Sequence, residues 1–154
     1  MKKIKKIEVT ANGLLQAVMK RVSQWEPPKQ KNEIAYRNHL LEVLRPLLPS
    51  DARIEKEYRH RGTTMDLWLE WKGLLFSDDL SFELKVNLTR KTDCDRLIGQ
   101  IEGLEPKNNK ILIILIGETE NSLLKRIQEK YHDFLDESEQ SMGIVLVGQV
   151  VGNA

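Results

Sequence analysis

Apolar and polar positions change their spacing along the chain, and each spacing predicts an element. Apolar residues recur every three or four positions over 13–25 and again over 32–48, which predicts two amphipathic helices. We expect Asn12 to cap the first helix. Pro46 is expected to kink the second helix or to end it early, because proline lacks the N–H that a helix interior needs.

Beyond residue 50 the apolar residues alternate with polar ones, which is typical of strands. The alternation predicts three strands, over 53–59, 65–72 and 80–88. Four further elements follow: a helix over 92–104, a strand over 110–116, a helix over 122–135 and a strand over 143–151. The order ααβββαβαβ predicts an α/β fold in which helices flank a mixed β-sheet.

Composition predicts one globular domain. The 154 residues are 40% hydrophobic and 31% charged, which suffices for a single core. The longest apolar run, residues 111–116, is far shorter than the roughly 20 residues that cross a membrane, and no signal peptide is recognisable. Cys94 is the single cysteine, which excludes an internal disulfide and a cysteine-based zinc site. We expect a cytoplasmic location and no membrane partner.

Charge is distributed unevenly although the net charge is only +1. Residues 1–61 carry 14 basic and 7 acidic residues, whereas residues 62–154 carry 10 and 16. This asymmetry predicts one face that attracts phosphates and another that holds carboxylates. The alternative is uneven surface charge without a function.

Acidic residues on two successive strands form the most informative group. If the strands 65–72 and 80–88 form a hairpin centred near residue 75 or 76, Asp66 lies opposite or diagonal to Glu83 and Lys85 on one face. Of three acidic-x-Lys triplets, only Glu83–Lys85 has an acidic residue on the preceding strand and a helix directly after it, which carries Gln100. The alternative is a solvated sheet face with cross-strand ion pairs.

Two carboxylates and an amine on one face of the sheet are suited to binding a metal ion and to hydrolysis at phosphorus. Carboxylate oxygens are ligands for Mg²⁺, which activates water and offsets charge at phosphorus. The Lys85 ammonium would orient that water or stabilise the charge that develops at phosphorus. The sequence therefore predicts a hydrolytic metal site built on Asp66 and Glu83.

With Asp66 on one strand and Glu83-Leu84-Lys85 on the next, residues 32–116 resemble the PD-(D/E)XK nuclease superfamily, which has the restriction-endonuclease-like fold. The resemblance implies that Asp66 and Glu83 bind metal and that Lys85 is catalytic. Residues 1–28 would then be a basic extension with an amphipathic helix, and residues 117–154 a C-terminal helix and strand of the same domain. Met65 replaces the proline of the family motif.

The resemblance adds two residues to the site. Glu33 matches the glutamate that many members carry on the helix before the sheet, as a third metal ligand, and Glu42 is the alternative at that position. Gln100 matches the glutamine on the following helix, where its amide would bond to the site or to a DNA phosphate.

We therefore expect a metal-dependent nuclease that hydrolyses DNA, with RNA not excluded, and that uses Mg²⁺ or in its place Mn²⁺. Seven basic residues close to the site in sequence are expected to contact phosphates: Lys29, Lys31, Arg37, Arg59, Arg61, Arg90 and Lys91. A homodimer or a protein partner would supply a larger surface. Two alternatives stay open: a non-catalytic nucleic-acid-binding or assembly module on the same fold, and an α/β interaction protein whose carboxylates are incidental.

Overall fold

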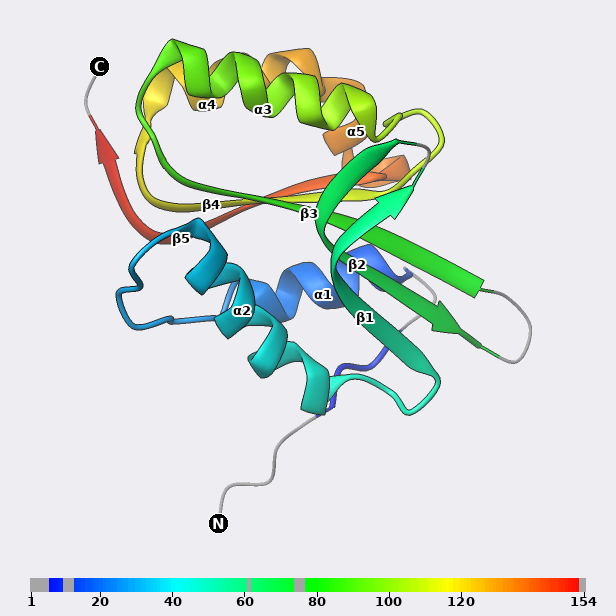
Figure 1. The fold of residues 1–154 in the computed structure, drawn as a ribbon. Helices are drawn as coiled ribbons and strands as arrows, with labels where there is room; N and C mark the ends of the chain where they lie inside the picture. The colour runs from blue at the N-terminus through cyan, green and yellow to red at the C-terminus, as the bar shows by residue number, and fades with distance from the viewer. Residues whose placement is uncertain (1–5, 10–12, 61, 74–76, 153–154) are drawn as a thin grey trace.

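Five strands form one mixed β-sheet in the computed structural model, which describes residues 6–9, 13–60, 62–73 and 77–152 (Figure 1). The spatial order follows the chain: β1 (Ala52–His60), β2 (Thr63–Lys72), β3 (Ser77–Leu88), β4 (Ile111–Glu120) and β5 (Met142–Gly152). The first three strands are antiparallel, and β4 and β5 run parallel to β3. The expected α/β class with a mixed sheet flanked by helices is confirmed.

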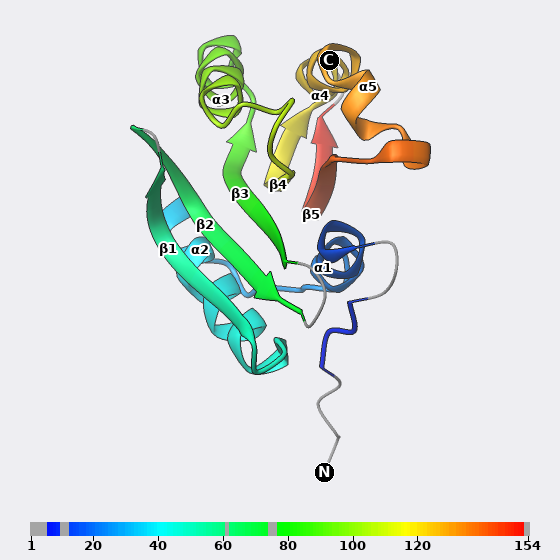
Figure 2. The same ribbon diagram turned by 90° about the vertical axis from the view of Figure 1, so that its right-hand side faces the viewer.

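Helices cover both faces of this sheet (Figures 1 and 2). Two of them, α1 (Leu14–Val22) and α2 (Glu33–Leu44), lie against one face, with α1 on β3, β4 and β5 and α2 on β1, β2 and β3. The other face carries α3 (Lys91–Gly103), α4 (Asn121–Lys130) and α5 (His132–Leu135). In the described part of the chain, no helix is long and apolar enough to cross a membrane.

Several boundaries differ from those expected. The second helix ends at Leu44 and continues as a 3₁₀ turn over Arg45–Leu47, because Pro46 cannot supply the backbone N–H of another helical turn. The helix expected over 122–135 is broken at Tyr131 into α4 and α5. Another short 3₁₀ turn, Glu137–Glu139, precedes β5. Asn12, the expected cap of α1, lies outside the described residues.

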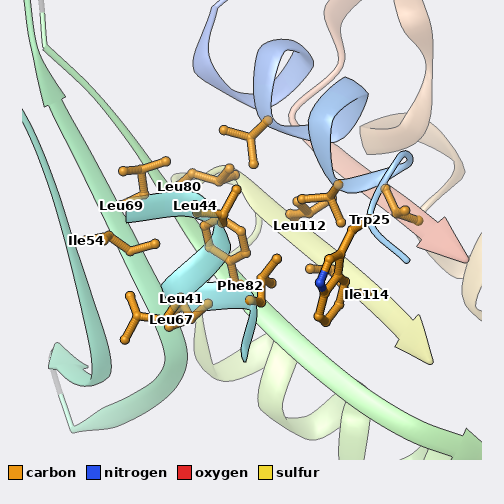
Figure 3. Packing of buried hydrophobic residues seen from close by; sticks show 14 of the residues in the cluster. Trp25, Leu41, Leu44, Ile54, Leu67, Leu69, Leu80, Phe82, Leu112 and Ile114 are labelled. Carbon is orange, nitrogen blue, oxygen red and sulfur yellow. The ribbon is translucent and has the colours of Figure 1, made fainter. Parts of the chain in front are cut away.

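Both faces of the central strands are buried. Leu112 and Ile114 of β4 pack with Phe82 under α1 and α2, and Figure 3 shows this cluster. Ile113 and Leu115, which point the other way, pack under α3 and α4. A strand covered on both faces carries apolar residues continuously, which explains the unbroken apolar run of β4.

Asp78 at the start of β3 ties α1 to the sheet. Its Oδ2 accepts a hydrogen bond from the backbone N–H of Leu14, 3.0 Å away, at the first residue of α1. The Lys110 ammonium lies 2.9 Å from both carboxylate oxygens. Since a helix N-terminus favours a negative charge, Asp78 takes the place of a capping side chain.

Replacing Asp78 by alanine is expected to lower the free energy of unfolding by about 2 kcal/mol, because one helix N–H and Lys110 both lose their partner. Urea denaturation followed by circular dichroism measures this change. Asp133→Ala is the matched control, because the Asp133 side chain is exposed, and it should change stability by less than about 0.5 kcal/mol. Equal losses for the two variants would contradict the capping role.

Candidate active site

The acidic residues expected in the site meet where β2 and β3 separate. The ladder between these strands ends at the pair Leu67 and Phe82, and Figure 2 shows the strands diverging beyond it. There the Asp66 carboxylate replaces a ladder partner, since its Oδ2 accepts a hydrogen bond of 2.8 Å from the backbone N–H of Leu84. Asp66 thereby lies next to Glu83, with which it shares a hydrogen bond, and close enough to Lys85 to feel its positive charge.

The neighbouring strand and α2 shape the surroundings of Asp66. In β1, Glu57 interrupts the regular pairing with β2 and has a positive φ of 52°. Arg37 of α2 donates a hydrogen bond of 2.9 Å to Glu57 Oε1. Burial raises the pKa of Asp66, whereas the Leu84 N–H and then the Arg37 guanidinium oppose this rise.

Arg37 requires a correction, because we expected it to contact a phosphate. Its side chain is buried, with the residue only 5% exposed, and its guanidinium bonds to Glu57 and Asn38. A buried guanidinium engaged in this way does not reach a nucleic acid. Arg37 instead supports the strand next to Asp66 and supplies a positive charge near its carboxylate.

Glu83 is the most deeply buried acid of the group, at 2% exposure. Burial and the nearby carboxylates of Asp66 and Glu33 raise the pKa of Glu83 to about 9. At neutral pH the Glu83 carboxyl therefore keeps a proton and shares a hydrogen bond with Asp66. Within the described residues its Oε1 is buried without any hydrogen-bond partner. Buried carboxyl oxygens normally have a hydrogen-bond partner, so this oxygen indicates a partner, such as a water or an ion, that the described residues do not supply.

Glu33 joins the group from the first turn of α2. The preceding residue, Asn32, caps the helix by accepting a hydrogen bond from the Ala35 N–H. Glu33 Oε2 lies 4.0 Å from Lys85 Nζ, and burial raises the pKa of Glu33 while Lys85 opposes the rise. Glu42, the alternative to Glu33, is exposed more than two helical turns further along α2.

Lys85 lies between two carboxylates. Its Nζ is 4.0 Å from Glu33 Oε2 and 4.0 Å from Asp93 Oδ1. Asp93, in the first turn of α3, was missed as a site residue. Hydrogen bonds from Arg90, and the positive charges of Lys85, Arg90 and Arg96, lower the pKa of Asp93. The sequence signal was an acid at the start of the helix that follows the Glu-x-Lys strand.

The structure does not bring Gln100 into this group. Gln100 is exposed about two turns beyond Asp93 on α3, and its side chain makes no hydrogen bond with any described residue. Among the expected phosphate contacts, five are exposed: Lys29, Lys31, Arg59, Arg90 and Lys91. Arg90 also bonds to Asp93, and Arg61 lies outside the described residues.

The acids of this group are of a type that binds hydrated divalent cations, but the described residues form no closed metal cage. In the part of the chain that the structure describes, no three His, Cys, Asp or Glu side chains are already arranged to hold a metal ion. Mg²⁺, however, is usually bound by one or two carboxylates, with waters and substrate phosphates completing its shell. Asp66 and Glu83 supply two carboxylates, and the partnerless Glu83 Oε1 is one of their oxygens.

Known proteins add nothing to this description of the site. Comparisons with models of protein families, with curated proteins and with solved structures find no match. The function therefore has to be inferred from the side chains themselves.

The free energy of unfolding of the metal-free protein should depend on pH, because Glu83 holds a proton in the folded state. Its folded pKa of about 9 lies above the ordinary 4.5, so unfolding releases a proton between these values. The stabilisation is complete below pH 4.5 and is lost as the pH rises towards 9. We expect Glu83→Gln, which keeps a neutral side chain, to gain at least about 1 kcal/mol over wild type between pH 5 and pH 8.

Urea denaturation in EDTA at the two pH values measures this difference. Glu42→Gln removes an exposed glutamate of the same type and should shift stability by the same small amount at both pH values. A gap between wild type and Glu83→Gln that stays constant with pH would show that Glu83 is not protonated in the folded state.

Proposed function

We propose that this protein is a metal-dependent nuclease that hydrolyses phosphodiester bonds of DNA. The observation that supports it best is the buried, partnerless Oε1 of Glu83, which lies in a carboxyl pair with Asp66 beside Lys85. A buried acid pair is costly to a folded protein unless a cation or a proton offsets its charge. Such a pair could hold a metal ion that activates water and polarises a phosphate, and the neighbouring ammonium group could stabilise the charge that develops.

The acids would bind Mg²⁺, or Mn²⁺ in its place, through Asp66 and Glu83, with Glu33 as a further ligand. When bound, the ion supplies Lewis-acid activation of water and of the phosphate. Glu83 must first release its proton, because only a carboxylate binds metal, so binding is expected to be tighter at higher pH. The Leu84 N–H holds Asp66 in place throughout, since the backbone of β3 is fixed by its pairing with β4.

Lys85 has a role separate from metal binding. Its ammonium has three donors, and the two carboxylates at 4.0 Å keep it at the site without forming short bonds to it. It is therefore available to donate a hydrogen bond to the attacking water or to a phosphate oxygen that gains charge. With Asp66 and Glu-x-Lys on adjacent strands and a helix on each side, we also propose a restriction-endonuclease-like fold.

Purified wild type is expected to nick supercoiled plasmid with Mg²⁺ or Mn²⁺ and to be inactive in EDTA. Asp66→Ala and Lys85→Ala should each lower the nicking rate by about 100-fold or more, because each removes a group that stabilises charge in the transition state. Glu33→Gln and Glu42→Gln form a matched pair on α2, of which only Glu33→Gln should slow nicking.

Plasmid left intact by wild type with both metals would contradict the nuclease proposal. DNA binding that survives EDTA without any nicking would instead point to a non-catalytic module on the same fold. Equal activity of Glu33→Gln and Glu42→Gln would remove Glu33 from the site.

Metal binding has its own readout in the absence of DNA. Mn²⁺ at about 100 times its dissociation constant should raise the melting temperature of wild type by roughly 5 °C. Asp66→Ala and Glu83→Gln should show little of this shift, because each removes one of the two carboxylates. The same shift in all three proteins would place the bound ion elsewhere.

A further inference from the structure

Asp93 is a nearly buried carboxylate with three cations around it. The residue is 7% exposed although it lies in the first turn of a helix. Arg90 donates to it through Nε at 3.0 Å and Nη2 at 3.4 Å, and Arg96 Nη1 lies 3.9 Å away. Lys85 Nζ completes the group at 4.0 Å. Asp93 thus offsets only one of the three positive charges, and Lys85 also faces Glu33 at 4.0 Å, so the three cations and two acids together remain net positive.

The two arginines keep most of their donors for another ligand. The side chains of Arg90 and Arg96 are 74% and 70% exposed. A guanidinium has five N–H donors, and the bonds to Asp93 use only two of those of Arg90. Exposed guanidinium groups fixed beside a third cation match the charge and geometry of a phosphate.

We propose that Asp93 is a positioning residue that holds Lys85, Arg90 and Arg96 as one cationic cluster, and that this cluster binds a backbone phosphate of the DNA strand beside the bond that is cut. The proposal rests on the proposed function, because it takes DNA as the substrate. Without Asp93 the three cations repel one another, and the long arginine side chains lose a fixed orientation. The acid therefore strengthens anion binding through preorganisation, although its own charge repels an anion.

Asp95 provides a matched control on the same helix. It is half-exposed and pairs with Arg126 of α4 at 2.6 Å, away from Lys85. Asp93→Asn and Asp95→Asn remove the same charge two residues apart. Simple electrostatic attraction predicts that both variants bind DNA more tightly than wild type. The positioning role predicts that they differ.

The experiment is fluorescence anisotropy of a fluorescein-labelled DNA duplex in EDTA across a range of salt concentrations, so that no cleavage occurs. Asp93→Asn should bind about tenfold more weakly than wild type, since it loosens charge-assisted contacts to phosphate. For Asp93→Asn, the slope of log K against log salt concentration should be about one to two units less negative than for wild type. This change corresponds to the loss of one or two phosphate contacts. Asp95→Asn should match wild type or exceed it, and Asp93→Glu should recover part of the loss.

Asp93→Asn that binds as tightly as Asp95→Asn, with an unchanged salt dependence, would overturn the proposal. Should Asp93→Asn fail to fold by circular dichroism, the double variant Arg90→Gln, Arg96→Gln decides instead, because both side chains are exposed, and it must show the same loss. If wild type bound no DNA, both the phosphate-binding role of the cluster and the nuclease proposal would be overturned. Wild type that nicks plasmid, with the two asparagine variants alike, would overturn only the role of Asp93.

Discussion

The site depends on one hydrogen bond at the point where two strands stop pairing. Because β2 and β3 separate after Leu67 and Phe82, the N–H of Leu84 is left for the Asp66 carboxylate. This bond fixes Asp66 against Glu83, and burial together with the closeness of the two acids raises the pKa of Glu83, so that it keeps a proton in the metal-free protein. On the same strand, Lys85 lies 4.0 Å from both Glu33 of α2 and Asp93 of α3.

The elements and the meeting of Asp66 with Glu83 and Lys85 could be predicted from the sequence. Alternation with period two defines which residues share a face, and a short hairpin limits which residues lie opposite one another to within one or two positions. The run of apolar residues in β4 likewise indicated a strand covered on both faces, as found. These features depend on the spacing of residues that are close together in the chain, so the sequence alone predicts them.

Other features depend on contacts between segments far apart in the chain. Arg37 looked like an exposed cation, but β1 covers it, and Glu57 pairs with it from 20 residues away. Asp93 lies in the first turn of the helix after the Glu-x-Lys strand, but that position alone does not predict that it lies beside Lys85. Gln100 matched a family position, yet it is exposed and its side chain makes no hydrogen bond with any described residue. Matches of single residues do not fix the orientation of a helix over a sheet, so these three positions required coordinates.

The central claim is that the Asp66 and Glu83 carboxylates together bind a divalent cation. Anomalous diffraction from a crystal soaked in Mn²⁺ at pH 8 tests it most directly. A manganese peak is expected within coordination distance of oxygens from both side chains, with Glu83 Oε1 among them. Full occupancy at some other position, or no peak between the two acids, would contradict it.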